Sequence, residues 1–440
     1  MNRDAAHQID TLTAELLGGP LPVRLRAWDG SEAGPAHGPV VVLRSPRAVR
    51  RLLWSPGELG LAEAYITGEL DVEGDLAEGL RSLWRAARDQ GLHPPRLRAG
   101  GPRAAASLLG RALLTAGRLG VIGPRPASPA EQARLTGTPH SRSRDRAAVS
   151  HHYDLSNAFY ALLLDESMAY SCGYWTAPPN EPGYGLADAQ RDKLELICRK
   201  LDLRPGARLL DVGCGWGSLS LHAAEHHGAE VTSVTLSREQ ARFVRERAAR
   251  RGLADRVDVQ WGDYRDIEAG GFDAVSTIEM GEHVGDAEYP AFAALLRRSV
   301  RPRGRVLVQQ MSRGSTAPGG GAFIETYIAP DMHMRPLGGT VSLLEDAGLE
   351  VRDVHALRED YVRTVRAWHR TLEERWEAFV ELVGERTARV WRLYLVGGAL
   401  AFEEGRMGVD QILAVRPDAE GGSGVGGTVP RWHTGPGAVS

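Results

Sequence analysis

The second half of the chain alternates short apolar runs with amphipathic stretches. The apolar runs predict buried strands, and the stretches in which apolar residues recur every three or four positions predict helices. The expected strands are 208–212, 230–235, 257–260, 272–277 and 305–310. The expected helices between them are 218–226, 237–250 and 288–299. Strands that alternate with helices predict an α/β fold with a doubly wound, Rossmann-like parallel sheet.

Further elements are expected on both sides of this alternating block. The additional helices are 151–164, 186–201, 340–347, 361–383 and 387–404, and the additional strands are 350–356 and 412–415. Together these elements predict one domain from 147 to 416. The tail, 417–440, is rich in glycine and is expected to be disordered.

The first 90 residues have a different pattern. Two apolar runs, 23–28 and 40–43, predict strands, and the polar, glycine-rich stretch 29–38 predicts a hairpin loop between them. The expected helices are 46–53, 58–66 and 75–88, the last with Asp75 as its N-cap. Residues 1–90 therefore predict a smaller α+β domain, in which no catalytic cluster is evident.

Between residues 91 and 146 the composition changes again. Residues 94–146 contain ten arginines and no lysine, and their only acids are Glu131 and Asp145. Projected on a helix over 103–119, the basic residues are Arg103, Arg111 and Arg118, and the residues roughly opposite are Leu109, Ala112, Ala116 and Leu119. A basic amphipathic helix is typical of proteins that lie on an anionic membrane, but a linker helix with solvated arginines has the same pattern.

Composition restricts the function classes. A hydrophobic content of 42% and a net charge of -3 are ordinary for a globular protein and give no reason to expect a nucleic-acid partner. No run of eighteen apolar residues occurs, and the first residues lack a signal-peptide core. The three cysteines have no C-x-x-C spacing, which argues against a disulfide scaffold or a structural zinc. We therefore expect a cytoplasmic protein without a metal site.

The strand 208–212 leads into a glycine turn. Gly213, Gly215 and Gly217 stand at alternate positions after Asp211, and a helix follows them. This G-x-G-x-G spacing differs from the G-x-G-x-x-G turn that binds a dinucleotide pyrophosphate. It suits a ligand without pyrophosphate, such as an amino acid joined to adenosine. The alternative is a turn that only packs the helix on the strand.

Polar residues also follow the next strands. They are Thr235, Leu236 and Gln240 after the second strand, and Asp263 and Tyr264 after the third. An acid beside an aromatic residue can hold the amine and the face of adenine. Because ligands bind at the carboxyl ends of strands in doubly wound sheets, these strand ends together predict the S-adenosylmethionine (SAM) site of a methyltransferase.

Several motifs resemble the cyclopropane fatty acid synthase family, which includes the mycolic acid methyltransferases. They lie at 152–157, 170–172, 210–217, 234–237 and 282–285. The resemblance covers about 150–416, and the N-terminal third resembles the extra domain of bacterial members that act on phospholipid. It implies transfer of the SAM methyl group to the double bond of a phospholipid acyl chain. It also implies a homodimer that associates peripherally with the inner face of the membrane.

The resemblance also assigns site residues. Tyr170 and Ser171 join the predicted cofactor-binding residues. In the family, a bicarbonate ion is thought to take the proton that the substrate loses, held by a Cys backbone, a Glu, a His and a Tyr. The matching positions here are Cys172, Glu282, Gln309 and Tyr361. Gln309 is a departure, since glutamine can donate a hydrogen bond but cannot carry a positive charge or relay a proton.

Structural alternatives remain open for some of these residues. Cys172 is either a site residue or a core thiol, and His283 is either catalytic or a support for the Glu282 loop. Tyr361 shares a helical face with Trp368, so core packing is its alternative role. Glu279 is either a second acid of the site or a solvated strand end.

The glutamine at position 309, where the family has histidine, affects which product is expected. Loss of a proton from the added methyl closes a cyclopropane, whereas a hydride shift before proton loss gives a methylene branch. With Gln309 and the unusual stretch 330–336, the chain is more similar to actinobacterial methyltransferases that make 10-methylene chains, precursors of 10-methylstearate. A separate NAD(P)H- or flavin-dependent reductase would saturate that branch. The alternatives are a cyclopropane synthase, a small-molecule methyltransferase and a non-catalytic lipid-binding protein, the last of which would not bind SAM.

Overall fold

The computed structural model describes residues 4–17, 21–89, 110–111, 113–133, 135–145, 156–178, 181–268, 270–314, 319–426 and 432. The predicted motif residues 152–155 and most of the arginine-rich stretch before residue 110 therefore lie outside the described residues. Contacts between Cα atoms divide the chain into two compact units. The first contains residues 1–132, 321–323 and 383–400, and the second contains 133–320, 324–382 and 401–440.

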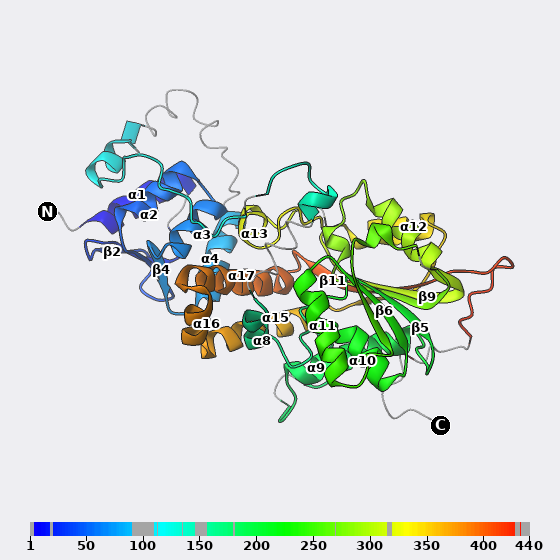
Figure 1. Ribbon diagram of the computed structural model, residues 1–440. Coiled ribbons are helices and arrows are strands. Elements are labelled where there is room, and N and C mark those ends of the chain that lie inside the picture. The colour runs from blue at the N-terminus through cyan, green and yellow to red at the C-terminus, as the bar shows by residue number, and fades with distance from the viewer. Residues whose placement is uncertain are drawn as a thin grey trace. The chain divides into compact units, whose positions relative to one another are not determined.

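The second unit is built on a seven-stranded sheet (Figure 1). Its strands are β5 (Arg208–Val212), β6 (Glu230–Thr235), β7 (Val257–Trp261), β8 (Phe272–Ile278), β9 (Val300–Ser312), β10 (Glu350–Ala356) and β11 (Gly408–Val415). Their order is β10-β11-β9-β8-β5-β6-β7. Strands β5 to β9 pair in parallel, and β11 is antiparallel to both of its neighbours. The predicted doubly wound α/β sheet is confirmed.

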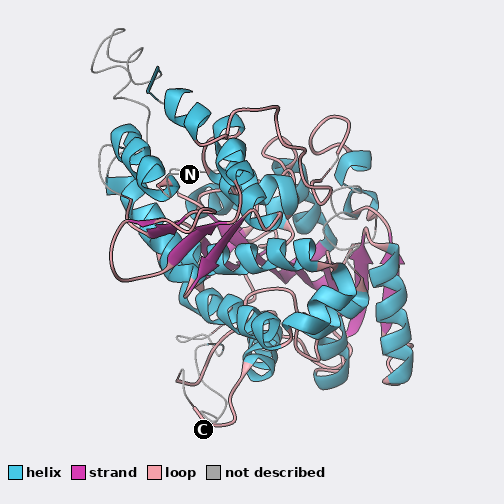
Figure 2. Cartoon of the chain, turned by 90° about the vertical axis from the view of Figure 1, so that its left-hand side faces the viewer, coloured by secondary structure: helices cyan, strands magenta, loops and turns pink. Residues whose placement is uncertain are grey.

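Helices cover both faces of this sheet (Figure 1), and Figure 2 distinguishes helices from strands by colour. Helices α9 (Leu186–Lys200), α10 (Ser218–His226) and α11 (Arg238–Arg250) pack on one face, and α12 (Tyr289–Ser299) and α14 (Leu337–Asp346) pack on the other. The neighbouring residues Leu209 and Leu210 of β5 belong to opposite core clusters, as side-chain alternation along a strand requires. Burial of both faces explains why β5 has no polar alternation.

The remaining helices of this unit differ in part from the predicted ranges. They are α8 (Asn157–Leu163), α15 (Arg358–Glu374) and α16 (Trp376–Val383), while α13 (Ala322–Tyr327) spans a boundary between the two units. The single helix expected over 361–383 is interrupted at Arg375, whose φ of -119° is not helical. Beyond this interruption, Phe379 packs its ring against Phe159, a tertiary contact that the local pattern does not contain.

The first unit contains a four-stranded sheet of order β2-β1-β3-β4. Its elements are α1 (Ala5–Leu17), β1 (Arg24–Arg26), β2 (Glu32–Ala33), β3 (Val40–Leu43), α2 (Pro46–Trp54), α3 (Glu58–Ile66), β4 (Leu70–Glu73) and α4 (Leu76–Asp89). The hairpin expected between 23–28 and 40–43 is wrong, because β1 and β3 pair in parallel. The expected loop contains β2, which folds back onto β1, and the antiparallel partner of β3 is β4.

Helix α17 (Glu385–Glu403) differs from the predicted domain boundaries. Residues 383–400 belong to the first unit, although the pattern placed this helix in the domain that begins at 147. The Arg389 guanidinium donates to the backbone oxygen of Tyr65 and to Asp71, each at 3.1 Å, and Leu393 packs on the core of this unit. These contacts join residues more than 300 positions apart, so no local pattern indicates them.

The arginine-rich stretch is helical at 110–111 and 113–118 where it is described. Ala116 is buried and Leu119 packs on the core of the first unit, so the predicted apolar side of this helix contacts protein. The exposed apolar residues of the helix are instead Leu113 and Leu114. Among the described residues, no helix combines the length and apolarity needed to cross a bilayer.

The predicted disorder of the tail is wrong for at least one of its described residues. Trp432 is 7% exposed and packs with Leu196 and Leu413. Asp418 forms an ion pair with Arg303. A tryptophan far along a glycine-rich stretch can pack where a distant apolar surface is available, which composition alone does not indicate.

Candidate active site

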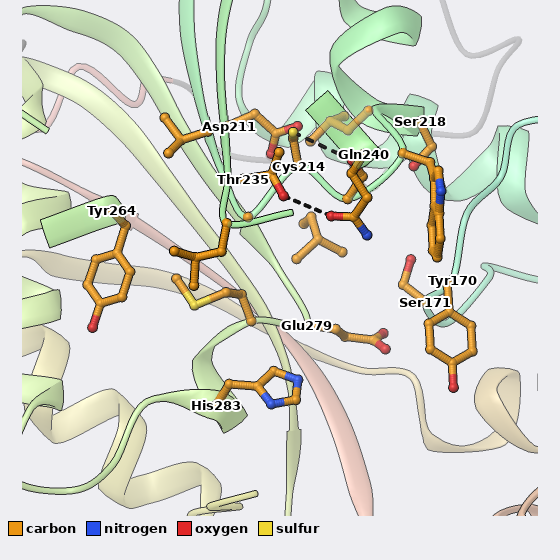
Figure 3. Close-up of a pocket in the computed structure, with 18 of the residues that line it drawn as sticks. Tyr170, Ser171, Asp211, Cys214, Ser218, Thr235, Gln240, Tyr264, Glu279 and His283 are labelled. Carbon is orange, nitrogen blue, oxygen red and sulfur yellow. Dashed lines mark hydrogen bonds between the residues drawn. The ribbon is translucent and has the colours of Figure 1, made fainter. Parts of the chain in front are cut away.

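A cavity opens at the carboxyl ends of β5, β6 and β8 (Figure 3). It contains about 1240 Å³ not filled by protein atoms, which includes space open to solvent. The predicted site residues that line it are Tyr170, Ser171, Asp211, Gly213, Gly215, Thr235, Leu236, Gln240, Tyr264 and His283. The labelled side chains among them come from several loops and strand ends and surround a common space. The predicted residues outside this lining are Cys172, Gly217, Asp263, Glu282, Gln309 and Tyr361.

The glycine turn has left-handed backbone at all three glycines, with φ of 81° at Gly213, 54° at Gly215 and 76° at Gly217. A Cβ at Gly217 would lie 2.7 Å from a methyl carbon of Val244. A Cβ at Gly215 would meet no atom within 4 Å, and Gly215 lines the cavity. The turn therefore serves two purposes, because Gly217 allows close packing of α11 and Gly215 leaves space open for a ligand.

Asp211 uses both carboxylate oxygens inside the protein. Its Oδ2 accepts a hydrogen bond from Ser220 at 2.6 Å, and its Oδ1 accepts one from Ser276 at 2.9 Å. Burial raises the pKa of this carboxyl, and the two serine hydrogen bonds oppose the increase. These contacts fix the end of β5 against α10 and β8. A direct contact between Asp211 and a cofactor stays a prediction.

At the end of β6, one polar group faces the cavity without a partner. Gln240 Oε1 accepts from the Thr235 hydroxyl at 2.8 Å, which orients the amide (Figure 3). Gln240 Nε2 is buried and has no hydrogen-bond partner among the described residues. A buried amide donor without a partner is costly. A ligand with hydroxyl or carboxylate oxygens would satisfy it.

At the end of β7, the predicted acid Asp263 forms an ion pair with Arg265. Arg265 donates to both carboxylate oxygens of Asp263 at 2.8 Å. Burial raises the pKa of Asp263, but the hydrogen bonds and charge of Arg265 outweigh it, so the pKa is lowered. Gly262 and Tyr264 line the cavity on either side of Asp263. The Tyr264 ring packs edge-on against Phe292. The predicted contact between Asp263 and adenine therefore stays a prediction, while Tyr264 lies where it can face a ligand.

At the end of β8, three predicted residues contact the carboxylate of Glu279, for which the sequence left two roles open. Glu279 Oε1 accepts from the backbone N–H of Cys172 at 2.8 Å and from Gln309 Nε2 at 2.9 Å. Glu279 Oε2 accepts from the Tyr361 hydroxyl at 2.5 Å. Burial raises the pKa of Glu279, and these hydrogen bonds together with the Lys193 charge oppose the increase. Glu279 is therefore a site acid and not a solvated strand end.

The predicted acid Glu282 has a different environment. It is fully buried, and neither carboxylate oxygen has a hydrogen-bond partner in the described part of the chain, although the amides of Glu282 and Met311 lie nearby. Burial and the charge of Glu279 raise the pKa of Glu282 to about 8. His283 faces the cavity, and burial lowers its pKa to about 4, so its imidazole is neutral near pH 7.

Cys172 contributes its backbone to the site and not its thiol. The thiol donates to the backbone oxygen of Gly173 at 3.1 Å and lies 3.6 Å from that of Leu357. Burial raises the pKa of this thiol well above its usual value. A neutral, internally bonded thiol is a poor nucleophile. Cys172 therefore combines both alternatives, because its thiol is a core group and its N–H is a site donor.

One buried cation of the site was missed in the sequence. Lys193 of α9 is 1% exposed, lines the cavity and donates from Nζ to Ser171 Oγ at 2.9 Å. Burial lowers its pKa, whereas the charges of Glu279 and Asp165 raise it. A signal was available, because Lys193 lies four residues from Ala189 and from Ile197 on the buried side of its helix.

Aromatic side chains form one wall beside the cavity. Tyr160 contacts Trp216 with a ring-centroid distance of 4.4 Å, and Tyr170 contacts Trp368 at 5.2 Å. Tyr170 and Trp216 line the cavity. The Tyr361 ring packs on Trp368 and on Phe402, so its predicted packing role is present together with its hydrogen bond to Glu279.

One cluster of possible metal ligands occurs among the described residues. Cys198, His222 and His227 place ligand atoms within 4.8 Å of one another. The sequence did not indicate it, because Cys198 and the two histidines come from different parts of the chain. Glu195 Oε2 lies 3.0 Å from His227 Nε2 and 3.6 Å from His222 Nε2. None of these residues lines the cavity, so we assign the cluster no part in its chemistry.

Comparisons with known proteins agree with this geometry. The family model for mycolic acid cyclopropane synthetase matches residues 140–412. A probable fatty acid methyltransferase of Pseudomonas putida is 38% identical over 91% of this chain and 93% of that protein. The tuberculostearic acid methyltransferase UfaA1 of Mycobacterium tuberculosis is 32% identical over 90% of this chain and 88% of that protein.

A solved structure shows the same similarity in three dimensions. The mycolic acid cyclopropane synthase CmaA1, complexed with SAH and CTAB, superposes with a TM-score of 0.57 at 29% identity. The match covers 61% of this chain and 97% of that one. With the family match over more than half of the chain, the protein belongs to the mycolic acid cyclopropane synthetase family of SAM-dependent methyltransferases.

Proposed function

We propose that this enzyme transfers the methyl group of SAM to the double bond of an unsaturated acyl chain in a membrane phospholipid and leaves a methylene branch. The observation that carries the proposal is the cavity itself, which combines the glycine turn, an aromatic wall and the hydrogen-bonded carboxylate of Glu279. The printed names of the relatives from P. putida and M. tuberculosis support a fatty acyl substrate.

The residues of the cavity fit SAM. Gly215 leaves room at the turn, Gln240 offers an unsatisfied N–H, and the ring of Tyr264 borders the same space. When bound, SAM supplies an electrophilic methyl group on a positively charged sulfur. Carboxylates and aromatic rings around the cavity favour a cation there.

The aromatic wall supports an alkene as the acceptor. An alkene is a weak nucleophile, so it must be held close to the methyl group in a reactive orientation. The carbocation left after methyl transfer needs aromatic faces and a carboxylate nearby, and it must be kept from water. Tyr170 and Trp216 lie at the cavity, and Tyr160 and Trp368 pack behind them.

The hydrogen bonds of Gln309 support a base site that differs from that of the family, and we associate this change with the methylene product. Gln309 donates to Glu279, and its own oxygen accepts from Gln411 Nε2 at 2.9 Å. This amide is held at both ends and cannot relay a proton as a histidine would. The match with a protein named tuberculostearic acid methyltransferase, over most of both chains, also supports the branched product.

The product assay tests the proposal directly. The purified protein is incubated with SAM and dioleoyl phospholipid vesicles, and the released fatty acids are analysed by mass spectrometry and proton NMR. We expect an acyl group that has gained one carbon and shows the two vinylic protons of a C=CH2 branch. Cyclopropane protons alone would contradict the proposed product. An unchanged acyl chain, from protein that binds SAM in calorimetry, would contradict the substrate class.

An apolar surface patch on the first unit supports contact with lipid. We define the patch by its members, Leu53, Trp54, Leu113, Leu114 and Ile122, each of which is more than half exposed. Trp54 Nε1 donates to the backbone oxygen of Gly123 at 3.1 Å, which joins α2 to the chain after the arginine-rich helix. Arg111 and Arg118 are exposed on that helix. Apolar and basic residues together favour an anionic membrane surface.

The other predicted partners remain proposals. A homodimer follows from the family resemblance alone. A separate NAD(P)H- or flavin-dependent reductase would consume a methylene product, because the sequence contains no second nucleotide-binding turn that follows a strand and opens a helix. No nucleic-acid partner and a cytoplasmic location at the inner face of the membrane are likewise proposed.

A further inference from the structure

The donors that the family resemblance assigns to bicarbonate are already occupied in this chain. The Cys172 N–H and the Tyr361 hydroxyl each have one hydrogen, and both donate to Glu279. Gln309, at the position where the family has histidine, donates to the same carboxylate. A bicarbonate ion at these donors would have to displace the Glu279 carboxylate, because two anions cannot share them. The residues present therefore do not fit bicarbonate.

We propose that Glu279 replaces bicarbonate as the base of this enzyme, so that its carboxylate removes the proton from the methylated acyl chain. A glutamate side chain presents the same planar group of two acceptor oxygens as bicarbonate. Here it is attached to the end of β8 and needs no binding equilibrium. The inference rests on the proposed function and specifies which group completes that reaction.

The backbone at Glu279 supports a dedicated role. Its φ is 50°, in the left-handed region, which is unfavourable for a residue with a Cβ. Its N–H donates to the backbone oxygen of Gln309 at 2.6 Å, which holds this conformation at the end of the strand. Strain of this kind persists where the surroundings impose it and is concentrated at functional sites. The conformation presents the carboxylate to the donors and to the cavity that it lines.

Gln309 is explained by the same arrangement. Gln411 donates to Gln309 Oε1, so the Gln309 amide presents its N–H to Glu279. A glutamine suits a fixed carboxylate, because it supplies one neutral donor and does not compete for the proton. The departure from histidine and the presence of Glu279 are therefore two parts of one change.

The proposed steps balance without a co-reactant. The methyl–sulfur bond breaks and its electron pair stays on sulfur, while the alkene π pair forms the new carbon–carbon bond. A hydride moves with its pair from the methylated carbon to the neighbouring cationic carbon. A C–H bond of the new methyl then breaks, and its pair forms the methylene double bond. The proton goes to Glu279 Oε2, which accepts a hydrogen bond from Tyr361 alone among the described residues and so has a second lone pair to offer. It passes to water after the product leaves.

Glu282 does not serve as this base. It lies outside the cavity lining, and its raised pKa of about 8 keeps it protonated near pH 7 beside the Glu279 charge. The two carboxyls then carry one negative charge between them. That charge is on Glu279, which has three donors and Lys193 nearby to stabilise it.

The test compares activity with and without bicarbonate. Wild-type protein and Glu279→Gln are assayed with SAM and dioleoyl phospholipid vesicles in buffer depleted of carbon dioxide, and then with added bicarbonate. The surface variant Glu345→Gln is the matched control for an acid-to-amide change, since Glu345 is exposed. We expect wild type and control to be active without bicarbonate. We expect Glu279→Gln to lose about 10²–10⁴-fold in turnover with SAM affinity kept.

A second pair of variants reverses the proposed replacement. Glu279→Gly removes the carboxylate and relieves the left-handed strain, and Glu279→Gly with Gln309→His also restores the family's histidine. We expect the double variant to bind ¹³C-bicarbonate in NMR and to need it for activity, whereas wild type does neither. Wild-type turnover that requires bicarbonate, or Glu279→Gln turnover within about threefold of wild type, would overturn the inference. So would a double variant that binds no bicarbonate.

The binding measurement separates this inference from the proposed function. Should wild type methylate no acyl chain, the proposed function fails. Bicarbonate binding then still decides whether Glu279 occupies the anion site. Should wild type methylate acyl chains only with bicarbonate, the proposed function stands and the inference fails.

Discussion

Single buried charges set the properties of the site. Lys193 is almost fully buried, and an isolated ammonium in that position would be strongly unfavourable. The charges of Glu279 and Asp165 compensate it, and its Nζ donates to Ser171. In return, the Lys193 charge favours the ionised form of Glu279. The affinity of Glu279 for a proton therefore depends on a balance between burial and a few named neighbours, which mutation can change one at a time.

The Tyr361 hydroxyl provides the first test of that balance. Its hydrogen bond lowers the pKa of Glu279, so Tyr361→Phe is expected to raise it. A base works when ionised, and activity falls as pH drops through its pKa. The acid limb of the kcat/KM profile should therefore move to higher pH. At neutral pH we expect about tenfold lower kcat/KM, the effect of losing one charge-assisted hydrogen bond.

The fold should survive this change, which makes the result interpretable. The Tyr361 ring packs on Trp368 and Phe402, and phenylalanine keeps those contacts. The thermal midpoint and SAM affinity of Tyr361→Phe should stay close to wild type. An acid limb that does not move, or moves to lower pH, would show that Glu279 does not limit the reaction.

Gln240 provides a test of cofactor binding. Replacement by methionine keeps the length of the side chain but removes the N–H, which has no partner in the described part of the chain. We expect SAM affinity in calorimetry to fall about tenfold, which corresponds to one hydrogen bond. Thr235→Val is the matched variant, because it removes only the internal hydrogen bond that orients the amide. A larger loss from Thr235→Val than from Gln240→Met would contradict direct contact between Gln240 and the ligand.

The proximity of site residues could be predicted from the sequence where a motif fixes both residue type and position. Cys172, Gln309 and Tyr361 were expected in one site, and they do meet at one carboxylate. Glu282 was expected as the fourth residue around a bicarbonate ion, but the group that the other three contact is the carboxylate of Glu279. Both acids follow β8 within four residues, and the left-handed turn at Glu279 decides which of them meets the donors. Composition and spacing do not reveal such a turn at a non-glycine residue.

The glycine turn between β5 and α10 is the element on which the cofactor site depends. Gly217→Ala would place a methyl group 2.7 Å from Val244 in a left-handed backbone conformation. Strain and overpacking together are expected to cost about 2–5 kcal/mol and to lower the thermal midpoint by several degrees. Gly215→Ala has no such clash and should cost only about 1–2 kcal/mol.

The same pair of variants should separate stability from binding. The methyl of Gly215→Ala would point into space that we assign to the cofactor, so SAM affinity should fall at least about tenfold while the protein stays folded. Gly217→Ala should lose less affinity, measured at a temperature where it is folded, because Gly217 does not line the cavity. Thermal unfolding and calorimetry on both variants check this. The reverse order of effects would contradict the assignment of the two glycines.

Elements were predicted best where both faces of a strand are buried. Strands β5 and β8 contain the short apolar runs 209–210 and 274–275, whose neighbouring side chains belong to core clusters on opposite sides of the sheet. The short strands β2 and β4 were missed, since two to four residues carry too little periodicity to stand out. The mistaken hairpin follows from β2, because its presence in the expected loop reverses the chain once more and makes β1 and β3 parallel.

At the scale of the whole molecule, some features depend on packing between residues that are far apart in the sequence. Residues 383–400 join the first unit through contacts with Tyr65 and Asp71, and Trp432 returns from the tail to the core of the second. Both features depend on partners far away in the sequence. A helix or a lone tryptophan can be recognised from its own residues, but the surface that it covers cannot.

The apolar surface patch of the first unit gives the last prediction. Leu113→Asp with Leu114→Asp removes its two most clearly solvent-facing leucines on the arginine-rich helix and adds negative charge. Sedimentation with anionic vesicles should show at least about tenfold weaker binding, because two leucines are no longer buried in the interface. Binding of wild type should weaken with salt, since the arginines act through a screened attraction. Val354→Asp, on β10, changes an apolar residue that is 41% exposed, against 55% and 65% for the two leucines, and is the control for an added negative charge outside the patch.

The role of the patch follows from comparing vesicle binding by the paired aspartate variant and by Val354→Asp. If the paired aspartates abolish vesicle binding while SAM affinity and activity on detergent-dispersed lipid persist, the patch acts in membrane contact and not in chemistry. If Val354→Asp weakens binding as much, the effect is one of overall charge, and the patch has no special part. If neither variant matters, lipid reaches the enzyme by another surface. In that case the exposed leucines require a different explanation, such as contact with a second copy of the chain.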